Sequence, residues 1–147
     1  MKTFTILFTL LINMFTHTVL ANELLTGTVI SHSWTENTFP KSWPTPKFET
    51  FICDEETLIW NNITNMKHLT HGVEKYTVVE IAPKLLQVSW KESPETTNYG
   101  IIWTLDFNQM VIRGVLVNID ANTNFVVSGK FSQQHNLNTK PYLKSCS

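Results

Sequence analysis

The sequence predicts an all-β protein, a small antiparallel up-and-down barrel of about eight strands. In the C-terminal half, stretches of β-type residues follow one another with only short turns between them. Parallel strands need long crossover connections, so turns this short indicate antiparallel neighbours. Such a meander hides its edges by closing into a barrel, and a barrel of this size can hold one small ligand.

Eight stretches of the chain have the composition and alternation of strands and are bounded by turn residues. An acidic turn at 54–56 separates the second predicted strand from the third, and no internal repeat interrupts the series. In chain order, the predicted strands are 26–31, 47–53, 57–62, 74–81, 85–91, 99–107, 110–118 and 124–131.

The segment between the first two predicted strands contains three prolines, at positions 40, 44 and 46. Proline cannot donate a ladder hydrogen bond, so this segment is excluded from the centre of a sheet. We expect an extended loop that covers one end of the barrel, with Phe39 and Trp43 directed toward the interior.

The N-terminus has the pattern of a secretory signal peptide. Lys2 supplies a positive charge, residues 4–20 are largely apolar, and small residues precede a cleavage site after Ala21. We predict a signal peptide over residues 1–21, export as a secreted or periplasmic protein, and one mature domain over residues 22–147. An uncleaved anchor is the alternative, but Asn13 and His17 interrupt an apolar run that is short for a membrane span.

The charge balance argues against several classes of partner. The chain has 11 basic and 12 acidic residues, so loss of Lys2 leaves 10 against 12 and a net charge of −2. We therefore expect no nucleic-acid partner and, after cleavage, no membrane partner. No phosphate-binding loop, hydrolase motif or metal-ligand spacing is present, which predicts no cofactor and no metal. The oligomeric state stays open.

Cys53 and Cys146 both lie in the predicted exported domain. An even cysteine count in an oxidising compartment favours a disulfide, and the alternative is two free thiols. The bond would close a loop of roughly ninety residues and contribute about 4–5 kcal/mol on the chain-entropy model.

Strand 85–91 has one apolar face, which carries Leu86, Val88 and Trp90. That face should look inward, because a slip of one residue would bury Gln, Ser and Lys instead. Glu92 continues the inward face at the strand end, near the barrel mouth. A carboxyl group there would have a raised pKa and could act as a catalytic acid or base. Alternatively, Glu92 turns out to solvent.

Arg113 is flanked on its own strand face by two valines. If that face is inward, the guanidinium would bind a ligand carboxylate; if it is outward, Arg113 is a surface charge. We predict ligand-binding residues in which Arg113 anchors a negative group and three tryptophans line the cavity: Trp60, Trp90 and Trp103.

Four segments, YTVVEIAP (76–83), VSWKE (88–92), LDF (105–107) and VIRG (111–114), carry a family resemblance. Over the last half of the predicted mature chain, the sequence resembles the MoaF-like family and the phenolic acid decarboxylases. The resemblance implies a lipocalin-like (calycin) barrel. It also implies a catalytic role for Glu92, which falls on the glutamate of the decarboxylase W-T-E motif. The chain departs from those enzymes because strand 26–31 has no tyrosine and no arginine precedes Trp90.

These observations predict an exported barrel that binds a small, largely apolar ligand, with a carboxylate as an option. A second hypothesis is a decarboxylase or lyase for aromatic acids, with Glu92 moving the proton. A third is a protein-interaction or inhibitor module whose interior is filled by aromatic side chains. A pocket reached by both Glu92 and Arg113 would favour the first two hypotheses over the third.

Overall fold

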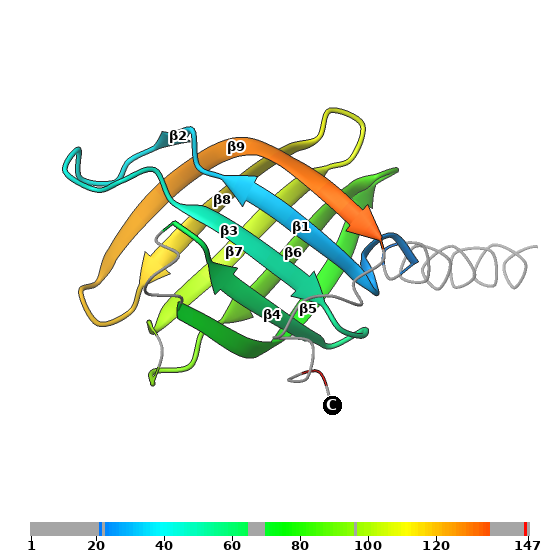
Figure 1. The fold of residues 1–147 in the computed structure, drawn as a ribbon, viewed down its shortest axis with the longest axis horizontal. Helices are drawn as coiled ribbons and strands as arrows, with labels where there is room; N and C mark the ends of the chain where they lie inside the picture. The colour runs from blue at the N-terminus through cyan, green and yellow to red at the C-terminus, as the bar shows by residue number, and fades with distance from the viewer. Residues whose placement is uncertain (1–20, 22, 65–69, 96, 136–145, 147) are drawn as a thin grey trace, which may run out of the picture.

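The computed structural model describes residues 21, 23–64, 70–95, 97–135 and 146. Its strands form a sheet that curves round until its two ends meet (Figure 1). The strands are β1 (Thr28–Ser33), β2 (Glu36–Asn37), β3 (Lys47–Ile52), β4 (Thr57–Asn62), β5 (Thr70–Ala82), β6 (Leu85–Lys91), β7 (Tyr99–Asp106), β8 (Val111–Asn118) and β9 (Thr123–His135).

The long strands pair in the order β1-β3-β4-β5-β6-β7-β8-β9, all antiparallel, and the pairing of β1 with β9 closes the barrel. The two-residue strand β2 lies beside Ser128 and Val127 of β9. The predicted all-β barrel of eight antiparallel strands is confirmed. Among the described residues, no helix has the length and apolar character needed to cross a bilayer. Of the predicted signal peptide, all but Ala21 lies outside the described residues.

Two strands are longer than the sequence predicted. β5 begins at Thr70 rather than at position 74, and β9 continues to His135 rather than ending at 131. Each of these strands serves two partners along its length: β5 pairs first with β4 and then with β6, and β9 pairs first with β8 and then with β1. The extra residues therefore lengthen the two strands that pair with a different neighbour in each half.

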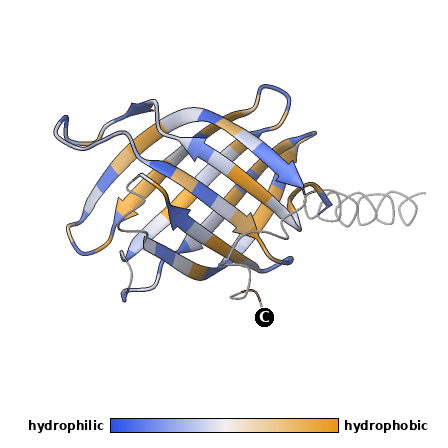
Figure 2. Ribbon diagram, viewed as in Figure 1, coloured by the Kyte–Doolittle hydropathy of each residue, from blue (hydrophilic) through white to orange (hydrophobic). Residues whose placement is uncertain are grey.

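Hydrophilic and hydrophobic residues alternate along the strands (Figure 2), and alternate residues are buried in the interior. On β6, Leu86, Val88 and Trp90 are buried while Gln87 and Lys91 are exposed. Each fully buried aliphatic side chain contributes about 1.5–3 kcal/mol of transfer free energy. The apolar face of β6 therefore points inward as predicted, and this orientation keeps the polar side chains of the opposite face in water.

The segment before β1 covers one end of the barrel, where β3 ends. Residues 23–25 form a helical turn, and Leu25 is fully buried. The Thr28 hydroxyl donates to the Leu25 carbonyl at 2.6 Å, and the Gln133 side chain donates to the Leu24 carbonyl. We refer to this end as the closed end.

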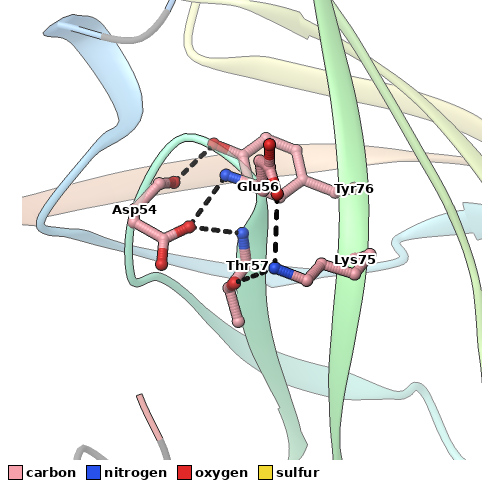
Figure 3. Close-up of polar contacts among 5 residues, drawn as sticks. All are labelled: Asp54, Glu56, Thr57, Lys75 and Tyr76. Atoms are coloured by element: carbon pink, nitrogen blue, oxygen red, sulfur yellow. Dashed lines mark hydrogen bonds and ion pairs between the residues drawn. The ribbon is translucent and has the colours of Figure 1, made fainter. Parts of the chain in front are cut away.

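The turn between β3 and β4 lies where the sequence predicted it and is fixed by polar contacts (Figure 3). The Asp54 carboxylate accepts hydrogen bonds from the backbone N–H groups of Glu56 and Thr57, at 2.8 and 2.7 Å. The Tyr76 hydroxyl donates to the Asp54 carbonyl at 2.9 Å, and Lys75 lies 3.4 Å from the Glu56 carboxylate. These contacts attach the turn to β5.

The predicted disulfide joins Cys53 and Cys146, whose Sγ atoms lie 1.99 Å apart. The bonded cysteines pack on a small apolar cluster outside the main core, formed by Val29, Phe51 and Ile59. These three residues are direct cross-strand partners on β1, β3 and β4. The disulfide therefore covers an apolar patch on the outer surface of the wall.

Candidate functional site

The end of the barrel opposite the closed end, where β4 and β6 end and β5 and β7 begin, contains a cavity of about 370 Å³. We refer to it as the mouth cavity. Its volume lies in the range of small-molecule sites. Aromatic and aliphatic side chains dominate its lining, with a few polar groups among them. The lining residues are Phe39, Trp43, Pro44, Pro46, Phe48, Trp60, Asn62, Thr64, Thr70, Glu92, Thr97, Tyr99, Ile101 and Leu116.

The proline-containing loop between β2 and β3 forms one side of this cavity, as expected from the sequence. Phe39 and Trp43 pack against Phe125 of β9, with ring centroids 5.0 and 5.8 Å apart. Thr38 ties the loop to the backbone of Val126, donating through its N–H at 3.1 Å and accepting at its hydroxyl at 2.9 Å. Trp43 stays 48% exposed, so it forms a rim and not a plug.

Glu92 is the acidic side chain among the described residues that line the mouth cavity, and it is only 8% exposed. Its carboxylate accepts a hydrogen bond from the Thr97 hydroxyl, and its backbone N–H donates to the Tyr99 carbonyl at 2.7 Å. Burial raises the pKa of Glu92 to about 7; the Thr97 hydrogen bond opposes this shift and the nearby charge of Glu74 adds to it. Near neutral pH the group can therefore both donate and accept a proton.

A second carboxyl group, that of Glu74, lies next to Glu92 across the β5–β6 pairing. Tyr76 on β5 pairs with Trp90 on β6. Glu74 lies two residues before Tyr76 and Glu92 two residues after Trp90, so antiparallel pairing and alternation place the two glutamates opposite each other on the inner face. Glu74 is 7% exposed, and its Oε1 accepts a hydrogen bond from the Ser93 N–H at 3.1 Å. At Gly72, an added Cβ would come within 2.8 Å of this oxygen, so the glycine leaves room for the carboxyl group.

Below the mouth cavity, aromatic side chains leave an inner hollow of about 30 Å³. His32 sits there with ring centroids 4.6 Å from Trp34 and 4.7 Å from Trp103, and Trp90 meets Trp103 edge to face at 4.5 Å. Burial lowers the pKa of His32 to about 3, so the imidazole is neutral at physiological pH.

The side chains around the inner hollow include buried polar atoms that have no hydrogen-bond partner among the described residues. These atoms are both ring nitrogens of His32, the Thr50 hydroxyl and the indole nitrogens of Trp34, Trp60, Trp90 and Trp103. A hollow of this volume is large enough for one water molecule. The base of the barrel is therefore mostly filled, whereas its mouth is open.

The structure brings together most of the residues that the sequence singled out. Glu92 and Trp60 line both the mouth cavity and the inner hollow, while Trp90 and Trp103 line the inner hollow.

The predicted role of Arg113 as an anchor inside the cavity is wrong. Arg113 is exposed on the outer face of β8, between Thr104 and Ser128 on the neighbouring strands. The buried neighbour Ile112 fixes the inner face of β8, and alternation then directs Arg113 outward. It therefore does not reach the cavity, and it is not the anchor for a ligand carboxylate that we predicted.

Sequence reasoning missed His32 and Glu74 as interior residues. A signal for His32 was present, because Ile30, His32 and Trp34 continue one alternating face. Glu74 also alternates with Tyr76, but only the strand register places it beside Glu92. Among the described residues, no group of three or more His, Cys, Asp or Glu side chains is arranged to hold a metal ion.

The fold and cavity define a closed, small antiparallel barrel with a hollow mouth. No family model matches this sequence, and no curated protein matches it. A solved structure is similar: a Burkholderia vietnamiensis protein described as a "putative beta-lactamase", with a TM-score of 0.60 and 10% sequence identity. The alignment covers 74% of this chain and 94% of the other. At this identity the similarity establishes the fold alone.

Proposed function

We propose that this protein is an exported barrel that binds a small, largely apolar molecule in the mouth cavity. The observation that carries the proposal is the cavity itself: about 370 Å³, lined mainly by aromatic, proline and aliphatic side chains. An open cavity at the mouth supports a ligand-binding protein. An interaction or inhibitor module would instead be expected to have a barrel that is filled throughout. The disulfide suits the oxidising compartment to which the predicted signal peptide would direct the chain.

The polar groups of the cavity argue against the carboxylate-bearing ligand that Arg113 had suggested. Glu92 lines the cavity and Glu74 lies behind it, whereas none of the described lining residues is lysine or arginine. A carboxylate placed there would meet like charge in a poorly solvated site. We therefore expect the preferred ligand to lack a negative charge.

Fluorescence titration tests the binding proposal, because Trp60 and Trp43 line the cavity. We expect 3-phenylpropan-1-ol to change the tryptophan emission saturably, with one site per chain. Leu116→Phe should weaken this binding at least several-fold by filling the cavity, whereas Val117→Phe, on the outer face of the same strand, should not. Absence of a saturable response, or equal weakening by both substitutions, would refute a site in the mouth cavity.

A second candidate is a decarboxylase or lyase for aromatic acids. Glu92, with its raised pKa and its place in the cavity, supports this reading, as does the resemblance to the MoaF-like family and the phenolic acid decarboxylases. The expected result is CO₂ release from hydroxycinnamic acids that is abolished by Glu92→Gln. Binding of the neutral probe without turnover of these acids would leave the binding protein as the function.

A further inference from the structure

We propose that the mouth cavity selects ligands that carry a protonated amine, with the ammonium group beside the Glu92 carboxylate and the apolar body against the aromatic walls. This inference rests on the proposed function and specifies the ligand class. Its basis is the combination, in one cavity, of a buried carboxyl group, several aromatic faces and no opposing cation among the described lining residues.

The charge of the mouth cavity comes from carboxyl groups. The titratable groups that surround Glu92 are Glu74 on β5, Tyr99 on β7 and His32 on β1. Because the His32 imidazole is neutral above about pH 3, it adds no positive charge. The side chains that β3 and β4 contribute to the cavity are uncharged: Phe48, Trp60 and Asn62. The described residues therefore give the cavity a negative potential, which attracts cations.

The aromatic walls of the mouth cavity also favour a cation. Five aromatic side chains line the cavity, from the loop, β3, β4 and β7: Phe39, Trp43, Phe48, Trp60 and Tyr99. The face of an aromatic ring carries negative quadrupole charge, and its attraction for an ammonium group reaches about 2 kcal/mol or more when the site is desolvated. The walls therefore favour the same ligand class as the carboxyl group, and they also provide apolar area for an organic substituent.

Glu92 couples cation binding to its own ionisation. Burial disfavours its charged form, and an ammonium group placed beside it would replace part of the lost solvation. A cationic ligand should therefore bind best when Glu92 is ionised. Its affinity should rise as pH increases through about 7 and should fall again only when an alkylamine loses its proton, near pH 10.

Three probes with one apolar body separate the possibilities: 3-phenylpropylamine, 3-phenylpropan-1-ol and 3-phenylpropanoate. At pH 8 we expect the amine to bind on the order of tenfold more tightly than the alcohol, and the carboxylate to bind most weakly. Glu92→Gln should reduce the ratio of amine affinity to alcohol affinity several-fold, and the preference that remains should be the part that the aromatic walls supply. Glu55→Gln, the same change at the exposed β3–β4 turn, should alter neither affinity.

A second measurement keeps the test independent of the Glu92 variant. At pH 6, amine binding to the wild-type protein should release protons, visible in calorimetry as a dependence of the heat on the buffer, whereas alcohol binding should not. Equal affinities for amine and alcohol, or tightest binding of the carboxylate, would overturn the amine proposal but leave a binding cavity. Failure of all three probes to bind would remove the proposed binding function as well.

Discussion

Two buried titratable side chains give opposite contributions to the pH dependence of stability. His32 has its pKa lowered from 6.5 to about 3 by burial, so its contribution is complete above pH 6.5 and is lost as pH falls toward 3. Glu92 has its pKa raised from 4.5 to about 7, so its contribution is complete below pH 4.5 and is lost as pH rises through 7. The two trends oppose each other between pH 4.5 and 6.5.

Replacing Glu92 should expose this balance. In the Glu92→Gln variant, the fall that Glu92 contributes between pH 4.5 and 7 should be absent, because the amide does not titrate, and the free energy of unfolding should rise with pH up to about 6.5 through the contribution of His32. Relative to wild type, the variant should therefore gain roughly 1–3 kcal/mol between pH 5 and pH 8. Urea unfolding at the two pH values measures the difference. An identical pH profile for wild type and variant would contradict a buried, raised-pKa Glu92.

Gly129 occupies a position on β9 where no side chain fits. An added Cβ would lie 2.0 Å from the Ser33 carbonyl oxygen, at the end of β1. Because the obstacle is backbone, relief requires strand movement, and we expect Gly129→Ala to lower the free energy of unfolding by about 1–3 kcal/mol or more. Gly100→Ala is the matched control, because its Cβ would meet only Val117, at 3.9 Å. Equal stability of the two variants in thermal or urea unfolding would contradict this close approach.

At the scale of elements, the disulfide holds Cys146 against the outer surface of β1, β3 and β4. The Cys53→Ala/Cys146→Ala double variant should lose about 4–5 kcal/mol on the chain-entropy model, plus the shielding of Phe51. Urea unfolding measures the loss. Dithiothreitol should destabilise wild type by a similar amount and leave the double variant unchanged. Wild-type stability that does not respond to the reductant would contradict the bond's role.

A substitution in the loop between β2 and β3 should affect ligand binding more than the stability of the fold. Trp43 lines the mouth cavity but is 48% exposed, and its contacts are with Phe39 and Phe125. We expect Trp43→Ala to weaken 3-phenylpropan-1-ol binding several-fold while changing the free energy of unfolding by less than about 1 kcal/mol. Unchanged affinity would show that the ligand does not reach the rim.

At the scale of the whole molecule, one apolar cluster includes buried residues from the helical turn and from all eight long strands. No strand can leave the closed wall without opening this cluster. We therefore expect one cooperative unfolding transition, with coincident midpoints for tryptophan fluorescence and far-ultraviolet circular dichroism in oxidised protein. Separate midpoints would show that the mouth of the barrel unfolds independently of its base.

Local pattern determined much of this molecule. Alternation with a period of two marks strands without reference to the rest of the chain, and short turns between them leave only antiparallel neighbours. The strand positions, the antiparallel barrel and the inward direction of Trp90 followed from this information. The disulfide was predicted instead from the even cysteine count in a chain expected to be exported, and alternation left Glu92 between the cavity and solvent. The predicted leader has the same local origin and stays a prediction.

Only the tertiary structure decided which charged groups share the interior. Alternation gives each strand two faces, but partners and register determine which side chains meet across the barrel. That register placed Glu74 beside Glu92 and His32 among tryptophans, and the burial of Ile112 placed Arg113 outside. The sign of the charge in the cavity, and hence the ligand class that it favours, is a property of contacts between strands distant in sequence.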